Sequence, residues 1–159
     1  MPISVAKTEK LDGLVVQQWT QLYDCVVIPQ FEPETGNLPP GVHEATWDEL
    51  LSRYGYTPYR LTLLAGLKTA LDALHLAGCG RVYIDGSFVT MKEEPADFDA
   101  CWETAGVDFP ELARLAPELF DFSARRAAQR ARYGGELFPA ELPAEPGGTV
   151  FLAYFQRDK

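Results

Sequence analysis

The sequence predicts one α/β (α+β) domain with a small mixed sheet flanked by helices. The 159 residues suit a single domain with its own core, and 47% hydrophobic with 23% charged residues is ordinary for a globular chain. From residue 46 onward, helical and β-rich segments alternate. Residues 1–45 are expected to be an N-terminal lead-in packed on the core, and residues 46–159 the domain proper, in one globular unit. The apolar pattern of Leu14–Ile28 leaves helix and strand open.

Two helices are predicted directly after the lead-in. Thr46 and Glu49 have the spacing of a capping box, which begins the first helix. Thr57 caps the second, with Pro58 at the first helical position, and this helix ends before Gly78. Its expected buried stripe consists of Leu61, Leu64, Leu67, Leu71 and Leu74.

The rest of the chain reads as strands around one long helical region. Arg81–Asp85 is β-rich and bounded by glycines, so it predicts a strand, and Asp97–Trp102 predicts a second. Phe109–Arg132 is expected to be mostly helical. Glu136–Phe138 is a candidate short strand and Thr149–Gln156 a final strand.

Composition excludes some classes of function. The formal net charge of -9 argues against broad, nonspecific affinity for nucleic acids. Three cysteines without CxxC spacing suggest reduced thiols in a cytoplasmic protein, and no segment looks able to cross a membrane. One basic run either binds nucleotide or RNA phosphate or forms the exposed face of a helix. It consists of Arg125, Arg126, Arg130 and Arg132.

Two acidic residues and a Gly-Ser pair suggest chemistry. Asp97 and Asp99 are two apart on a predicted strand, so both side chains leave the same face. Mg²⁺ is a natural partner, because it prefers hard oxygen ligands and is often held by one or two carboxylates plus substrate phosphates. Gly86 follows a strand and lets the backbone approach a phosphate, while Ser87 supplies a hydroxyl donor.

These motifs resemble the signature of the nucleotidyltransferase superfamily. The residues are Ile84–Ser87, then nine residues, then Asp97–Asp99. The short spacing looks most like the minimal nucleotidyltransferases. The resemblance implies a nucleotidyltransferase fold in which Gly86 and Ser87 hold the triphosphate of an NTP, and Asp97 and Asp99 hold Mg²⁺. More widely, three segments look like features of a small bacterial group with this core, namely Ile28–Phe31, Leu38–His43 and Tyr133–Gly135.

The resemblance also implies a third carboxylate on a later strand, able to act as general base. Glu136 fits the order of elements in the family, since it follows a long helical region. Glu103 and Asp108 are the alternatives for this third carboxylate. Lys92 lies between the two halves of the motif. It either reaches a phosphate or is a solvated surface lysine.

The resulting hypothesis is an enzyme that moves a nucleoside monophosphate from an NTP to a hydroxyl. The acceptor is a tRNA end, a protein side chain or a small molecule. The resemblance places such a protein in a bacterial toxin–antitoxin or phage-defence pair, with a cognate toxin or antitoxin as partner. A noncatalytic binding module on the same fold is the alternative. A nuclease using the same carboxylates is a third, less favoured because triphosphate explains Gly-Ser better.

Overall fold

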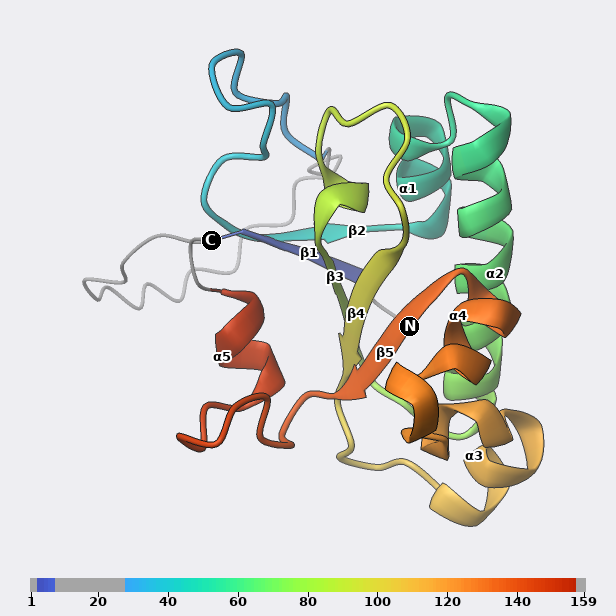
Figure 1. Cartoon of the computed structure of the whole chain (residues 1–159). Coiled ribbons are helices and arrows are strands. Elements are labelled where there is room, and N and C mark those ends of the chain that lie inside the picture. Colours follow the sequence, from blue (N-terminus) through green and yellow to red (C-terminus); the bar gives the residue numbers. More distant parts are fainter. Residues whose placement is uncertain (1–2, 8–27, 157–159) are drawn as a thin grey trace, which may run out of the picture.

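The computed structural model describes residues 3–7 and 28–156. A five-stranded mixed sheet in the order β2-β1-β3-β4-β5 runs through it (Figure 1). β1 is antiparallel to β2 and parallel to β3, while β4 is antiparallel to β3 and parallel to β5. The α+β class with a small mixed sheet is therefore confirmed. The strands are β1 (Ile3–Lys7), β2 (Gly41–Ala45), β3 (Val82–Asp85), β4 (Phe98–Trp102) and β5 (Gly135–Pro139).

Two of these strands come from the predicted lead-in. β1 and β2 lie within residues 1–45 and extend the sheet beyond β3, so this region forms part of the core sheet. Nearly all of Leu14–Ile28 lies outside the described residues; Ile28 itself is buried.

The helices divide between the two faces of the sheet. α1 to α4 cover one face and α5 lies on the other (Figure 1). The helical region after residue 108 is interrupted by short 3-10 turns. The elements are α1 (Trp47–Tyr54), α2 (Pro58–Leu76), α3 (Phe109–Leu115), α4 (Ala127–Tyr133) and α5 (Phe151–Phe155), with 3-10 turns η1 (Ser87–Val89), η2 (Pro117–Phe120) and η3 (Ser123–Arg125).

Both predicted helix starts are confirmed. The Thr46 hydroxyl accepts from the Glu49 backbone N–H at 3.2 Å, and the Glu49 carboxylate accepts from the Thr46 N–H at 2.7 Å. Thr57 caps α2 by accepting from the Arg60 N–H. The predicted stripe is wrong at Leu61, which is 44% exposed. Since the buried positions of α2 recur from Arg60 through residues 63, 64, 67, 70, 71 and 74, Leu61 falls outside the helical repeat that faces the core.

The predicted final strand is wrong, because this segment forms α5 instead. The rings of Phe151 and Phe155 are one helical turn apart, and both contact Phe138 on β5, with centroids at 4.0 and 5.9 Å. A strand would send residues four apart to the same face as well, but about 13 Å from each other. One helical turn lets both rings pack on a single residue, and that packing outweighs the β propensity of the aromatic run.

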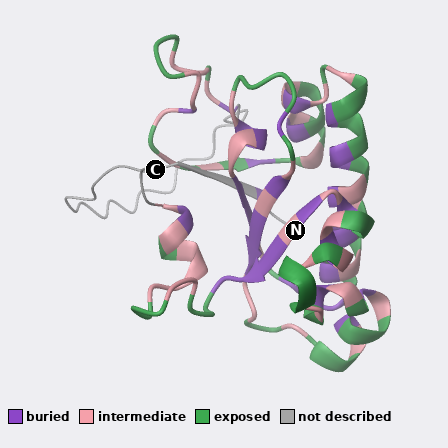
Figure 2. Cartoon of the chain, in the orientation of Figure 1, coloured by how far each residue is buried: buried purple, intermediate pink, exposed green. Residues whose placement is uncertain are grey.

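The sheet separates two clusters of buried side chains. Ile84, Ala100 and Leu137 are in register and belong to the large core under the helices. Tyr83, Cys101 and Phe138 are in register on the opposite face, where α5 packs against them. Figure 2 shows that β3, β4 and β5 are buried over most of their length.

Candidate functional site

The turn after β3 requires glycine. Gly86 has φ 81° and ψ −167°, a conformation that is essentially restricted to glycine. A Cβ atom at this position would lie 2.8 Å from Oδ2 of Asp99. Ser87 then opens η1, and its carbonyl oxygen accepts from the Thr90 hydroxyl at 2.7 Å. The Gly-Ser turn therefore lies directly against the Asp-x-Asp strand, as the motif implied.

Three carboxylate residues form a row across the sheet. Asp85 is in register with Asp99 across the antiparallel pair β3–β4, and Asp99 is in register with Glu136 across the parallel pair β4–β5. Residues in register share one face of a sheet. Asp85 is only 8% exposed, while Asp99 and Glu136 are half-buried. The row lies on the α5 face, next to the row of Tyr83, Cys101 and Phe138.

Asp85 is the member that sequence reasoning missed. It is part of the motif segment, but its opposition to Asp99 depends on the register between β3 and β4. Asp85 also affects the neighbouring row. The pKa of the Cys101 thiol is raised mainly by burial, and the negative charge of Asp85 is the second cause. Cys101 is therefore held in its neutral form and packs as an apolar residue.

The predicted metal ligands lie at the start of β4. Asp97 is half-buried and precedes the strand by one residue, and Asp99 is its second residue. Among the residues that the structure describes, no three His, Cys, Asp or Glu side chains gather as a metal site. Two aspartates fit Mg²⁺ nonetheless, because this ion commonly takes one or two carboxylates and completes its shell with water and substrate phosphate.

Glu136, the predicted third carboxylate, is held by an arginine. Its Oε1 forms an ion pair with Nη1 of Arg130, and the two side chains are 18% and 36% exposed. Burial lowers the pKa of the neighbouring Arg126 guanidinium, and the charge of Glu136 acts in the opposite direction. Glu136 thus lies beside Asp99 in register but faces two arginines.

The two rivals of Glu136 have other roles. Glu103 lies just beyond the far end of β4 and accepts from the Tyr83 hydroxyl at 2.8 Å. Asp108 caps α3, where its carboxylate accepts from the Glu111 N–H at 3.0 Å. Neither is in register with Asp99, whereas Glu136 is.

The loop that carries Lys92 is fixed by a buried arginine. Arg60 is fully buried and donates to the carbonyl oxygens of Phe88, Thr90 and Lys92 at 2.9, 3.1 and 2.7 Å. The Lys92 side chain is exposed, and its role toward phosphate stays a prediction. Arg60 was not singled out from the sequence, since an arginine within a leucine-rich helix looks like a solvent-facing residue.

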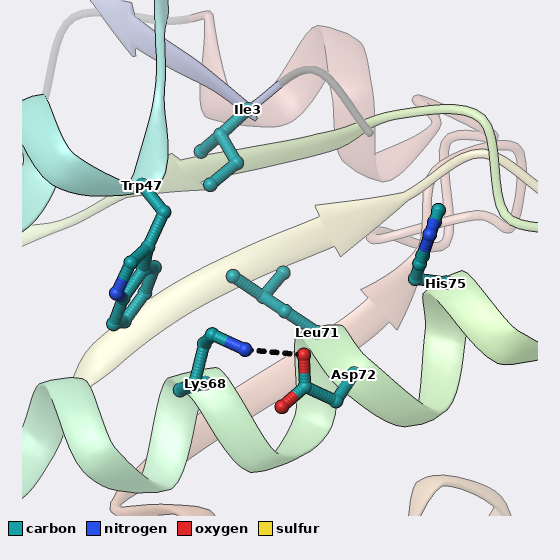
Figure 3. A pocket seen from close by; sticks show the side chains of 6 residues that line it. All are labelled: Ile3, Trp47, Lys68, Leu71, Asp72 and His75. Atoms are coloured by element: carbon teal, nitrogen blue, oxygen red, sulfur yellow. Dashed lines mark hydrogen bonds and ion pairs between the residues drawn. The ribbon is translucent and has the colours of Figure 1, made fainter.

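A hollow lies on the helical side of the sheet (Figure 3). Its one ammonium is neutralised, because Lys68 Nζ lies 2.5 Å from Asp72 Oδ1. None of the predicted site residues contributes to it. It is lined by Ile3, Trp47, Lys68, Leu71, Asp72 and His75.

Fold and site together define an α+β domain with a carboxylate row and a glycine-dependent turn on one sheet face. Residues 29–159 match the model of the family described as "Family of unknown function (DUF6932)", and the chain belongs to this family. No curated protein and no solved structure matches it. Within the described part of the chain, no helix is long and apolar enough to cross a membrane. The two described cysteines, Cys79 and Cys101, are free and buried.

Proposed function

We propose that this protein is a bacterial, cytoplasmic, Mg²⁺-dependent nucleotidyltransferase that moves a nucleoside monophosphate from an NTP to a hydroxyl group. The observation that carries the proposal is the close approach of Gly86 to Asp99. A backbone turn able to receive phosphate and a carboxylate able to hold a cation adjoin one another, and the turn has no room for a side chain.

Each residue has a defined role in this proposal. The N–H groups after Gly86 and the hydroxyl of Ser87 donate to phosphate oxygens and orient the triphosphate. Asp97 and Asp99 hold Mg²⁺, which when bound neutralises charge on the transferred group and the leaving pyrophosphate. Glu136 accepts the proton of the acceptor hydroxyl, for which its carboxylate has to exchange its contact with Arg130.

The acceptor in the proposal is a hydroxyl of RNA, protein or a small molecule. A tRNA end and a Ser, Thr or Tyr side chain are the first two to test. A cognate toxin or antitoxin is the proposed protein partner, on the basis of the resemblance to minimal nucleotidyltransferases.

Transfer is tested with NTPs labelled at the α-phosphate. The protein is incubated with Mg²⁺, each of the four NTPs, and either total tRNA or total cell protein. Label in one of these acceptors is expected with the wild type and should be lost with Asp97→Ala. Glu94→Ala removes the same charge from an exposed residue of the neighbouring loop and should transfer normally. Transfer by Asp97→Ala would contradict the assignment.

A noncatalytic binding module is the second candidate, and the Arg130–Glu136 ion pair favours it. An arginine that neutralises the third carboxylate leaves a site able to bind nucleotide without a free base. The two functions separate in one assay. A module binds Mg²⁺-NTP, or a partner protein, but gives no labelled product with any acceptor. Glu136→Gln should abolish transfer by an enzyme and leave binding by a module intact.

A further inference from the structure

α4 brings two arginines to the open edge of the sheet. β5 is the last strand of the sheet, and α4 lies beside it on the helical side (Figure 1). Arg126 nevertheless contacts Phe138 and Phe151, which belong to the cluster on the opposite face. Its side chain therefore passes around the edge strand. Arg130, one helical turn later, pairs with Glu136 on the same face.

A strained backbone directs Arg126 to this position. Ala124, Arg125 and Arg126 have φ values of 45°, 53° and 55°. The left-handed region is unfavourable for residues with a Cβ, and three such residues in a row are rare. Strain of this kind persists where the surroundings over-determine it, and it clusters at functional sites.

The Arg126 guanidinium stacks on aromatic rings and makes no hydrogen bond to another residue that the structure describes. Its carbon lies 4.2 Å from the centre of the Phe138 ring and 5.2 Å from that of Phe122. Its Nε is buried and has no hydrogen-bond partner among the described residues. The stacking fixes the plane of the guanidinium without using the N–H groups of its two terminal nitrogens, so these groups are available to a planar or tetrahedral oxyanion.

The two arginines place positive charge at the β5 end of the carboxylate row. Both guanidinium groups lie beside Glu136, while Asp99 and Asp85 lie one and two strands further away from them. An arginine fork matches phosphate oxygens in two parallel hydrogen bonds. Arg125 and Arg132 are exposed, so the basic run divides into two outward-facing and two inward-facing members.

The topology separates this place from the Gly-Ser turn. Gly86 follows β3, Asp99 is on the central strand of the row, and the arginines contact side chains of β5. Two strand spacings, about 10 Å, lie between β3 and β5. We therefore assign a phosphate beside the arginines to a different group from the triphosphate at Gly86. It would lie at β5, next to Glu136, the proposed base for the acceptor hydroxyl.

We propose that Arg126 and Arg130 bind a phosphate monoester of the acceptor, so that the acceptor is a phosphorylated molecule with a nearby hydroxyl. The role as an acceptor subsite rests on the proposed function. The phosphate site itself does not, because it needs neither Mg²⁺ nor NTP.

The test is a calorimetric titration with inorganic phosphate in Mg²⁺-free buffer. The wild type should bind phosphate saturably. Arg126→Met and Arg130→Gln, which keep much of the side-chain stem, should each weaken binding by about ten-fold or more. Arg132→Ala, the same charge change at an exposed position of α4, should bind as the wild type does. Glu136→Gln should bind more tightly, since it releases Arg130, whereas Glu94→Gln should not.

Three results would overturn the proposal: no binding by the wild type, equal loss with Arg132→Ala, or unchanged affinity in Arg130→Gln. Arg130 is partly exposed, so its substitution should leave the protein folded even if Arg126→Met does not, and the dispersion of the amide proton spectrum checks this. Asp97→Ala/Asp99→Ala should retain phosphate binding while losing Mg²⁺-NTP binding, so the two proposals fail separately. Glycerol 3-phosphate and a 5′-phosphorylated RNA oligomer then identify the source of the monoester by their relative affinity.

Discussion

Replacing Gly86 with alanine should damage both the stability of the domain and its nucleotide site. The backbone conformation at φ 81° and ψ −167° costs a residue with a Cβ about 1–3 kcal/mol. The new methyl group would also lie 2.8 Å from Oδ2 and 3.6 Å from Cγ of Asp99, so the carboxylate has to rotate away. At roughly 2–4 °C per kcal/mol for a chain of this size, the melting temperature should fall by about 2–12 °C.

Thermal and urea unfolding measure this change, with Gly147→Ala as the matched control. Gly147 has no heavy atom within 4 Å of the position its Cβ would take, so its substitution should leave the melting temperature within about 1 °C of the wild type. Mg²⁺-dependent NTP binding should be lost in Gly86→Ala at temperatures where the protein is still folded. Equal stability of the two variants, or full nucleotide affinity in Gly86→Ala, would refute the reasoning.

Three further predictions concern the framework of the site. Gly66→Ala should lower the free energy of unfolding by about 3 kcal/mol or more, because its Cβ would lie 1.9 Å from the carbonyl oxygen of Tyr133. Urea unfolding measures this change, and a variant as stable as the wild type would contradict the prediction. Arg60→Met leaves three loop carbonyl groups without their donor, so it should destabilise the protein by about 3 kcal/mol or more, and hydrogen exchange of the loop amides should accelerate. Burial, followed by the charge of Glu118, raises the pKa of Tyr133 from 10 to about 12. The unfolded state therefore loses the phenol proton at a lower pH than the folded state, and the free energy of unfolding should decline as the pH rises from 10 to 12. That decline should be shallower in Tyr133→Phe, and an identical slope in both proteins would remove Tyr133 as its cause.

The sequence predicted those elements whose signals are local. The caps at Thr46 and Thr57 are short-range hydrogen bonds, and the structure has both. Glycine boundaries and β-rich composition located β3, and the strand predicted at Asp97–Trp102 corresponds to β4. The strand predicted at Thr149–Gln156 was wrong because the outcome there depends on Phe138, a distant residue that two rings of α5 share. Propensity alone does not contain such a contact.

The candidate site was predictable in its motif and not in its surroundings. Gly86, Ser87, Asp97 and Asp99 were predicted from a motif that resembles that of the nucleotidyltransferases, and Glu136 from the order of elements that this resemblance implies. Asp85 became part of the row only through the strand register, which the sequence does not specify. The division of the arginines into inward and outward members depends on the left-handed turn before α4, and three consecutive non-glycine residues in that conformation are not expected from any local rule.

The central claim is that the Gly-Ser turn and the two aspartates form one site for a nucleotide and its metal ion. Calorimetric titration of the four NTPs, with and without Mg²⁺, tests it most directly. The comparison is between the wild type, Asp97→Ala/Asp99→Ala, and Glu93→Ala/Glu94→Ala, a pair of exposed residues with the same charge change. The account predicts Mg²⁺-dependent binding that only the aspartate variant loses. Absence of binding by the folded wild type, or equal binding by all three proteins, would contradict it.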